Sequence, residues 1–537
     1  MFFIIIVCAL HRGTFMRAFN TAGTCRPTQH YMVDITERLE IIQRMVAKGD
    51  YFCINRGRQY GKTTTLEAIK STLERAGYTV FSLSFENLGQ NLFSSDEKLC
   101  AAVLWLMKDA VENGLVAGLS DMSRELLLNA INDEIRPVET VIFSRLLNKL
   151  CRFNNKPVVL TIDEIDKASS NSSLVTFLGI LRNLFLVRQD STTFQSVILA
   201  GVYDIKNLKL RIRPDEQHQY NSPWNIAVPF DVDMSLSAKG IAGMLSDYKS
   251  DHKLSFDEQI VAQLIRDYTG GYPFLVSRIC QIMDTNGFSW DEQGVLKAVN
   301  VILMERNTLF DNMIKKLDDY PELKATLKRI LFNGVRETYN PDEKYIQIAT
   351  MLNYIANQDG QVVIACRIME TRLYNFFLAE QKASKMFLHG QAEKNQFIHD
   401  GVIDMSHLLE RFVVHMHETF HLDKEHQFLE DNGREIFLTY LRPIINGIGN
   451  YYIEAQTRDN NRMDVVVDYL GIRYVVELKI WRGDSYNQRG EEQLCRYLES
   501  FDLQVGYLLS FCFNRKKQSG LLPPVQLKGR TLIEAIV

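Results

Sequence analysis

The chain has 537 residues, of which 46% are hydrophobic and 23% are charged. This composition is typical of folded globular proteins and excludes disordered and collagen-like classes. The length predicts about three or four domains of roughly 100–200 residues each. The formal net charge of −4 excludes a general polycation that coats nucleic acid, so any nucleic-acid site must be a local basic surface.

The nine cysteines are scattered and contain no C-x-x-C pair, so they indicate a reducing, cytoplasmic compartment and no paired zinc ligands. The apolar start Met1–Leu10 is about half of the ~20 residues that a membrane-spanning helix needs. It also lacks the basic flank and cleavage site of a signal peptide. We expect residues 1–29 to be an extension whose true start is Met16, with no membrane association; a short membrane segment is the alternative.

Four further regions differ in their pattern. Residues 30–230 alternate short apolar strands with amphipathic helices, which predicts an α/β domain with a parallel sheet. Residues 231–315 read as helices only and predict a helical lid. Residues 316–390 are helical but contain an apolar run after Asp359-Gly360, which predicts a winged-helix-like module. Residues 391–530 read as helix, three strands, helix and strand. The predicted fold class is therefore an α/β multidomain protein.

The first chemical motif is a polar loop between a strand and a helix. The strand Tyr51–Asn55 runs into Arg56–Thr64, and a helix with apolar Leu66, Ile69 and Leu73 follows. A P-loop requires this context, because successive backbone N–H groups and the helix N-terminus hold phosphate oxygens. The match is imperfect, since Arg56 stands where the motif has glycine. An ordinary helix N-terminus is the alternative.

These positions predict a nucleotide site. We expect Lys62 to reach the β- and γ-phosphates and the Thr63 hydroxyl to ligate Mg²⁺. The residues assigned to binding of the nucleotide are Gly57, Arg58, Gln59, Tyr60, Gly61, Lys62, Thr63 and Thr64.

A second motif lies about 100 residues later. The continuous apolar run from Pro157 to Ile162 predicts a buried parallel strand. It ends in Asp163 and Glu164, at the strand end where open α/β sheets bind ligands. We expect Asp163 to hold Mg²⁺ and Glu164 to polarise the attacking water. A strand that ends in a solvated acidic turn is the alternative.

Together these motifs resemble the AAA-like branch of P-loop ATPases, which implies ATP and Mg²⁺ as cofactors. The resemblance places a sensor after the strand Ser196–Gly201, where Tyr203 and Asp204 replace the usual Asn, Ser or Thr. Gly270-Gly271-Tyr272-Pro273 resembles the G-x-P lid signature of STAND-like ATPases, which implies that Pro273 lies near the base or ribose. A helix-ending turn is the alternative. The basic run 206–214 is either a trans-acting arginine source, a phosphate-backbone contact or a solvated face.

The C-terminal region carries a second constellation. Asp464 lies in a predicted strand, Gly471 makes a turn, and Glu477 and Lys479 lie in the partner strand. Because side chains repeat every two residues, Glu477 and Lys479 share one face. Asp464 can approach Glu477 where the strands diverge. The two carboxylates are suited to Mg²⁺, or Mn²⁺, and Lys479 to orienting or deprotonating the attacking water.

Asp464…Glu477-x-Lys479 resembles the PD-(D/E)XK nuclease superfamily, whose restriction-endonuclease-like fold is αβββαβ. The elements occur in that order: a helix at 434–441, a strand at 450–456, the two strands above, a helix near 490–500 and a strand at 505–511. The resemblance adds Glu435 in the first helix and Gln493, with Tyr497, in the second. A hairpin with an exposed charge pair is the alternative.

The whole chain resembles bacterial proteins that join an AAA-like ATPase to a PD-(D/E)XK domain. This implies an ATP-controlled, metal-dependent nuclease that cleaves DNA, or RNA, forms a homo-oligomer and acts in defence or mobile-element biology. The alternative is an ATP-dependent switch whose C-terminal domain binds nucleic acid or a protein without cleaving. The histidines at 415, 417 and 421 predict a surface helix rather than a metal site.

Overall fold

The computed structural model describes residues 17–130, 135–202, 224–332, 337–379, 385–419, 430–445, 449–452, 465–480, 491–492, 494–495, 498–499, 502–512 and 519–537. The chain divides into two compact units. Unit 1 comprises Met1–Arg266 and Gly271–Gly287, and unit 2 comprises Asp267–Gly270 and Phe288–Val537. Among the described residues, none of the helices combines the length and apolar character that a bilayer crossing requires.

A parallel sheet forms the centre of unit 1, as the sequence predicts. Its strands are β1 (Phe52–Asn55), β2 (Thr79–Ser84), β3 (Val158–Asp163) and β4 (Ser196–Gly201). The order across the sheet is β1-β4-β3-β2, and every neighbouring pair is parallel. The two middle strands, β3 and β4, are buried along their whole length, because helices cover both faces of a parallel sheet of this kind.

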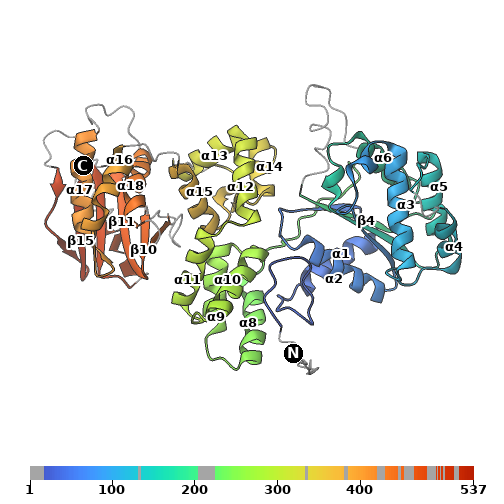
Figure 1. Ribbon diagram of the computed structural model, residues 1–537, viewed down its shortest axis with the longest axis horizontal. Coiled ribbons are helices and arrows are strands. Elements are labelled where there is room, and N and C mark those ends of the chain that lie inside the picture. Colours follow the sequence, from blue (N-terminus) through green and yellow to red (C-terminus); the bar gives the residue numbers. More distant parts are fainter. Residues whose placement is uncertain are drawn as a thin grey trace, which may run out of the picture. The chain divides into compact units, whose positions relative to one another are not determined.

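Helices lie on both faces of this sheet (Figure 1). One side carries α1 (Thr36–Lys48) and α2 (Lys62–Arg75). The other side carries α3 (Asp96–Glu112), α5 (Thr140–Phe153) and α6 (Ser172–Leu186), with α4 (Asp121–Ala130) against α5. The core of that second side joins Phe81, Leu160 and Leu199 of the strands to Phe143 and Phe177 of the helices.

A helical segment follows the sheet. In unit 1 it comprises α8 (Ala238–His252), most of α9 (Glu258–Thr269) and α10 (Pro273–Asn286). The N-terminal segment packs on α8: the rings of Phe19 and Tyr31 lie 5.0 and 5.3 Å from that of Tyr248, and the Tyr31 hydroxyl donates to Asp251 at 3.0 Å.

Unit 2 begins with α11 (Glu292–Met304), α12 (Thr308–Asp319), α13 (Pro321–Phe332) and α14 (Lys344–Met351). A hairpin of β5 (Ile355–Gln358) and β6 (Gln361–Ile364) follows, and then α15 (Arg367–Ala379). The hairpin turns at Asp359 and Gly360, whose φ angles of 51° and 79° favour glycine at the second position. The apolar run after Asp359-Gly360 is therefore one strand of a hairpin.

A second sheet forms the C-terminal part of unit 2. Its order is β13-β15-β12-β11-β10-β9, with β14 paired to β15. β9, β10 and β11 pair antiparallel, whereas β11, β12 and β15 pair parallel. The strands are β9 (Gly449–Tyr452), β10 (Val465–Tyr469), β11 (Ile472–Ile480), β12 (Val505–Phe511), β13 (Gly520–Leu521), β14 (Val525–Leu527) and β15 (Arg530–Ile536). The last three lie beyond the strand at 505–511 with which the predicted element order ends.

The two faces of this sheet have different covers. The helices α16 (Lys385–Glu393), α17 (Met405–Thr419) and α18 (Glu430–Ile445) pack together on one face (Figure 1). A small hairpin of β7 (Ile398–His399) and β8 (Val402–Ile403) lies between α16 and α17 in the chain. On the other face, the helical residues Leu494 and Leu498 pack against Val475 and Leu508.

Close packing of the three helices depends on glycine. A Cβ at Gly390 of α16 would lie 2.1 Å from the carbonyl oxygen of Tyr440 in α18, so the two backbones approach more closely than any other residue permits. The predicted surface helix is wrong for His415, which is only 4% exposed on α17. Packing against His389 and Glu393 of α16 buries it. His421 lies outside the described residues.

Candidate functional site

The phosphate loop, residues 56–61, joins β1 to α2. Two of its residues have left-handed backbone angles, Gln59 with a φ of 57° and Gly61 with a φ of 78°. Gly61 is the N-cap of α2, which begins at Lys62. The first N–H groups of a helix have no partner within the helix, so they and the helix dipole favour an anion at this end.

Lys62 lies folded into this loop. Its side chain is 6% exposed, and Nζ donates to the carbonyl oxygens of Arg56 at 3.0 Å and Gly57 at 2.9 Å. Burial lowers the pKa of Lys62, although the carboxylates of Glu164 and Asp163 oppose that shift. The ammonium group is thus held at the phosphate loop beside carboxylates of the next motif.

Thr63 and Asp163 meet across the end of the sheet. The Thr63 hydroxyl donates to Oδ2 of Asp163 at 2.6 Å, and Oδ1 of Asp163 accepts from the backbone N–H of Glu164 at 2.9 Å. A hydroxyl and a carboxylate oxygen at this separation fit the oxygen ligands that Mg²⁺ prefers. The structure therefore brings together the two residues that the sequence assigns to Mg²⁺.

Glu164 is the carboxylate assigned to the attacking water. It has a φ of 53°, an uncommon conformation for a residue with a side chain. Burial raises the pKa of Glu164, the charge of Asp166 raises it further, and Lys62 opposes the shift. A carboxyl group with a raised pKa is better matched to proton transfer near neutral pH.

Asp166 is a residue of this site that was not predicted from the sequence. Its Oδ1 accepts the backbone N–H of Val202 at 3.1 Å, and it would lie 2.6 Å from a Cβ at Gly201. Asp166 thereby connects the turn after β3 to the end of β4, and its charge raises the pKa of Glu164. The signal in the sequence was the third acidic residue in Asp163-Glu164-Ile165-Asp166.

Arg56 replaces glycine without blocking the loop. Its guanidinium donates to the carbonyl oxygens of Asn55 at 2.9 Å and Val232 at 3.0 Å, and it lies over the ring of Phe230. The side chain is therefore anchored by the segment that precedes α8, while the Arg56 carbonyl still accepts from Lys62.

The Gly270-Gly271-Tyr272-Pro273 segment contacts the phosphate loop through its last two residues. The Tyr272 hydroxyl donates to the carbonyl oxygen of Arg58, and its ring packs edge-on against Tyr60 at 4.7 Å. Pro273 lies 4.0 Å from the position of a Cβ at Gly61 and is the first residue of α10. The sequence predicts proximity of Pro273 to the nucleotide but not the role of Tyr272 as a contact of the loop.

The other residues of this region have separate placements. The Thr64 hydroxyl accepts from the backbone N–H of Cys25 at 3.2 Å. Tyr203, Asp204 and the basic run 206–214 lie outside the described residues.

Charged and polar side chains gather on one face of the second sheet. Glu477 and Lys479 of β11 are 5% and 4% exposed and follow Val475 at two-residue spacing, so they share its face. Across the parallel register, Lys479 pairs with Ser510 of β12, and Glu534 of β15 pairs with Leu508. The Ser510 hydroxyl donates to Glu534 at 2.5 Å.

Glu491 completes this group. Burial raises the pKa of Glu491, Glu534 raises it further, and Lys479 lowers it, so these three side chains are electrostatically coupled. We call the set the acidic cluster: Glu477, Lys479, Glu491, Ser510 and Glu534. Glu491, Ser510 and Glu534 were not predicted from the sequence, because the register that joins β12 and β15 to β11 is not visible there.

The other residues that the resemblance to nucleases assigns are Asp464, Gln493 and Glu435. Asp464 and Gln493 lie outside the described residues, although Asp464 directly precedes Val465, which pairs with Val476 beside Glu477. Glu435 lies on α18, on the opposite face of the sheet, with Oε1 3.2 Å from Nζ of Lys328.

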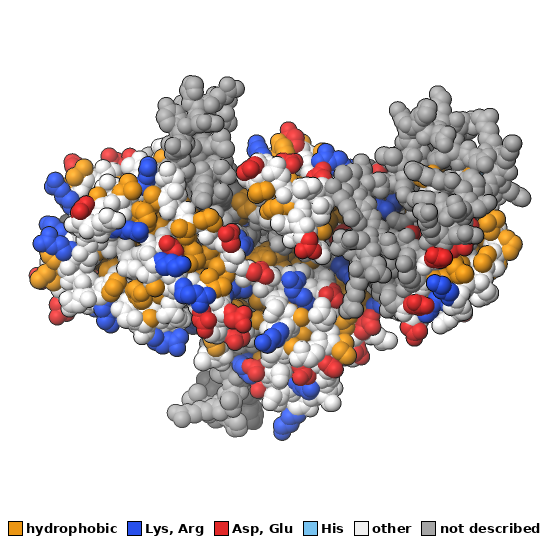
Figure 2. Space-filling view, turned by 180° about the vertical axis from the view of Figure 1, so that it is seen from behind, with side chains coloured by type: hydrophobic (Ala, Val, Ile, Leu, Met, Phe, Trp, Pro, Cys, Tyr) orange, Lys and Arg blue, Asp and Glu red, His pale blue; other side chains and the backbone are white. Residues whose placement is uncertain are grey.

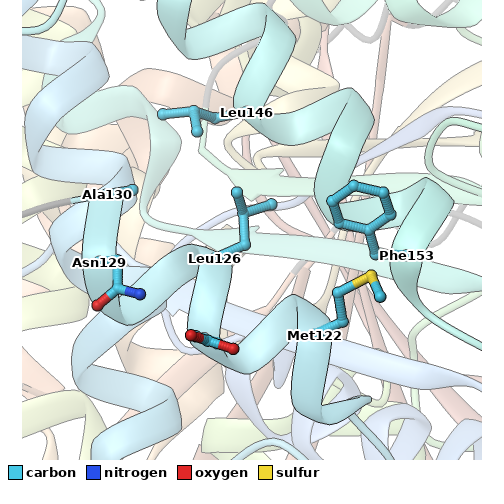
Figure 3. A pocket seen from close by; sticks show the side chains of 7 residues that line it. Met122, Leu126, Asn129, Ala130, Leu146 and Phe153 are labelled. Atoms are coloured by element: carbon cyan, nitrogen blue, oxygen red, sulfur yellow. The ribbon is translucent and has the colours of Figure 1, made fainter.

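An apolar pocket lies between α4 and α5, with a volume of about 350 Å³. Figure 3 shows the side chains of Met122 and Phe153 close together at one end of it, with Leu126 between them and Leu146. It shares no residue with the phosphate loop or the acidic cluster, and Glu125 is its one acidic lining residue. We assign it no chemistry.

Surface charge gives no broad basic area on the face seen in Figure 2, where lysine and arginine are interspersed with aspartate and glutamate among the described residues. This distribution agrees with the net charge of −4.

A protein-family model described as an AAA-like domain matches residues 26–379. No match was found among curated proteins. Three similar solved structures are a Walker-type ATPase of Pyrococcus abyssi, the ORC2 protein of Aeropyrum pernix and a RuvB variant of Thermotoga maritima. Their sequence identities are 16%, 13% and 15%, with TM-scores of 0.45, 0.37 and 0.31. The matches cover 66%, 69% and 62% of this chain and 99%, 100% and 92% of those chains.

Proposed function

The chain belongs to the AAA-like domain family, and on that premise we propose that unit 1 binds ATP with Mg²⁺ and hydrolyses it at the phosphate loop. The observation that carries this proposal is the 2.6 Å hydrogen bond between Thr63 and Asp163. It puts a hydroxyl from the start of α2 and a carboxylate from the end of β3 within reach of one cation.

In this proposal, each residue has a distinct task. Lys62 moves from the carbonyl oxygens of the loop to the β- and γ-phosphate oxygens, where its charge balances theirs. Thr63 and Asp163 hold Mg²⁺, which neutralises developing phosphate charge when bound. Glu164 orients the attacking water and accepts its proton.

The test is ATP turnover by the purified chain and by Lys62→Ala. We expect a loss of roughly 100-fold or more, as for removal of one preorganised charge-stabilising donor. The control is Lys70→Ala on the same helix. The Lys70 Nζ donates to the Leu115 carbonyl oxygen, away from the phosphate loop, so this variant should turn over ATP at the wild-type rate. Equal rates in the wild type and Lys62→Ala would remove the assignment.

We further propose that the acidic cluster, with Asp464, binds Mg²⁺ or Mn²⁺ and hydrolyses phosphodiester bonds in DNA under control of the nucleotide state. Support comes from the burial of Glu477 and Lys479 on one sheet face, because buried charges are costly unless partners or a metal compensate them. The metal would stabilise charge on the scissile phosphate, and Lys479 would orient or deprotonate the water.

This second proposal is tested by cleavage of plasmid, linear, single-stranded and RNA substrates with each metal and nucleotide. We expect cleavage by wild type and by Glu499→Gln, an exposed control on the helix of Glu491. Cleavage should fall to background in Asp464→Asn and Lys479→Ala. If wild type binds but cleaves no substrate, the C-terminal sheet serves a regulatory switch that only binds nucleic acid or a protein.

We also propose that residues 316–390, which contain α13, α14, the hairpin of β5 and β6, and α15, form a winged-helix-like module that acts as a spacer. The order of helices and hairpin is that of such modules, but α14, the helix before the hairpin, has Lys344 as its only cation. A helix that reads DNA needs several phosphate contacts. Lys344→Ala should therefore leave DNA affinity and its salt dependence unchanged, whereas a reduced salt slope would indicate a DNA contact.

A further inference from the structure

Two histidine–glutamate pairs face each other between α16 and α17. On α16, His389 and Glu393 are four residues apart, and on α17, His415 and Glu418 are three apart. Both spacings put the two side chains of a pair on one helix face. The rings of His389 and His415 are stacked, with centroids 3.9 Å apart.

Glu393 fixes the orientation of His415. The Nε2 atom of His415 lies 2.9 Å from Oε2 of Glu393. Arg411 donates to both oxygens of Glu393, at 2.5 and 3.3 Å, and Tyr440 donates to Oε2 at 3.3 Å. Arg411, His415 and Tyr440 together hold the Glu393 carboxylate in place.

Each ring nitrogen of His415 lies beside a carboxylate. A carboxylate only accepts hydrogen bonds, so Nε2 of His415 donates to Glu393. Nδ1 faces a second carboxylate, that of Glu418, and would give up any hydrogen it carries when a metal ion binds there. Histidines that bind metals usually donate their other ring N–H to a carboxylate in this way.

The Nδ1 side of His415 lies close to ligand atoms of two more residues, Glu418 and His389. Nδ1 lies 3.0 Å from Oε2 of Glu418, and the ligand atoms of His389, His415 and Glu418 all lie within 4.8 Å of one another.

We propose that His389, Nδ1 of His415 and Glu418 bind one divalent transition-metal ion of the zinc class, with Glu393 orienting His415. Two imidazoles and a carboxylate suit Zn²⁺ and its neighbours, whereas Mg²⁺ and Ca²⁺ prefer oxygen ligands alone. Three protein ligands leave one position of a tetrahedral ion for water or another ligand. Binding requires small rotations of the stacked rings and links α16 to α17.

The same helix supplies a matched control. His407 and Glu410 on α17 have the same spacing as His415 and Glu418, with Nδ1 of His407 3.4 Å from Glu410. Their side chains are 38% and 56% exposed, and neither belongs to the set of ligand atoms above. This pair tests whether a histidine and a glutamate at helical spacing suffice.

The experiment is a Zn²⁺ titration of the full chain, stripped with chelator and held in excess Mg²⁺ so that the oxygen-ligand sites are occupied. Calorimetry should give one zinc site in wild type and in His407→Ala. Affinity should fall at least tenfold in His389→Ala and Glu418→Gln, and about 10- to 100-fold in Glu393→Gln through loss of the orienting contact. Co²⁺ should give the visible spectrum of a four-coordinate ion in wild type, and this spectrum should be absent from His389→Ala and Glu418→Gln.

Folding is controlled separately. The Glu418 side chain is 57% exposed, so Glu418→Gln should keep the circular dichroism of wild type, and only wild type and His407→Ala should gain thermal stability with Zn²⁺. The proposal is overturned if wild type binds no zinc. It is equally overturned if His389→Ala and Glu418→Gln bind zinc as tightly as wild type, which would place the ion elsewhere.

Discussion

The hydroxyl of Thr63 donates a 2.6 Å hydrogen bond to the carboxylate of Asp163, 100 residues further along the chain. The contact exists because β1 and β3 lie on either side of β4 and run in the same direction. Their carboxyl ends therefore meet at one edge of the sheet, where open α/β sheets bind ligands.

Asp163→Asn should weaken binding of Mg²⁺–ATP by roughly tenfold, equivalent to about 1.4 kcal/mol, because an amide replaces the charged oxygen. Nucleotide binding without Mg²⁺ should change little, since Lys62 and the phosphate loop remain. Titration of a fluorescent ATP analogue with and without Mg²⁺ checks this. An equal loss in both conditions would argue against a metal role for Asp163.

Tyr272→Phe should lower ATP affinity about 2- to 10-fold, the effect of losing a hydrogen bond of ~0.5–1.5 kcal/mol, because the hydroxyl that holds the Arg58 carbonyl is removed while the ring remains. The control is Tyr248→Phe, which removes a hydroxyl donated to Asp284 at 2.6 Å. Calorimetric titration measures the ATP affinity of both variants. If Tyr272→Phe binds ATP as tightly as Tyr248→Phe, Tyr272 does not position the loop.

The pH dependence of ATP turnover should report Glu164. The proposed base acts as a carboxylate, so activity is present above its pKa and is lost as the pH falls through it. Because that pKa is raised above its ordinary 4.5, the acid limb should lie at a higher pH than for an exposed glutamate.

Asp166→Asn should move this limb to lower pH, since it removes the charge that most strongly repels the Glu164 carboxylate. Asn keeps an oxygen for the Val202 N–H. Glu86→Gln removes a more weakly repelling charge and should give a smaller shift. Rate profiles of the three proteins test the order, and a shift of the Asp166→Asn profile to higher pH would contradict it.

Gly390→Ala should destabilise unit 2 by about 1–3 kcal/mol, a common cost of overpacking, because its Cβ would meet the Tyr440 carbonyl oxygen at 2.1 Å. Gly179→Ala in α6 has no atom within 4 Å of the new Cβ and should stabilise unit 1 by roughly 0.5–1 kcal/mol, the difference between Gly and Ala within a helix. Scanning calorimetry compares the two. An unchanged transition in Gly390→Ala would mean that α16 moves freely away from α18.

Local pattern alone determined much of this protein. The strand at 505–511 matches β12 residue for residue, and the predicted turn near 470–471 is where Leu470 and Gly471 have φ angles of 54° and 83°. Such features depend on side-chain alternation and on glycine, which neighbouring residues specify. The two motifs that contain Lys62 and Asp163 are equally readable, because one is a strand, a loop and a helix in succession and the other is an apolar strand that ends in acidic residues.

Only the tertiary structure decided which distant residues meet. Tyr272 reaches Arg58 over 214 positions, Ser510 bonds Glu534 through the pairing of β12 with β15, and His415 is buried because α16 brings Glu393 to it. These contacts follow from strand register and helix packing. Both are set by the burial of many apolar side chains at once, so no short stretch of sequence contains the information that specifies them.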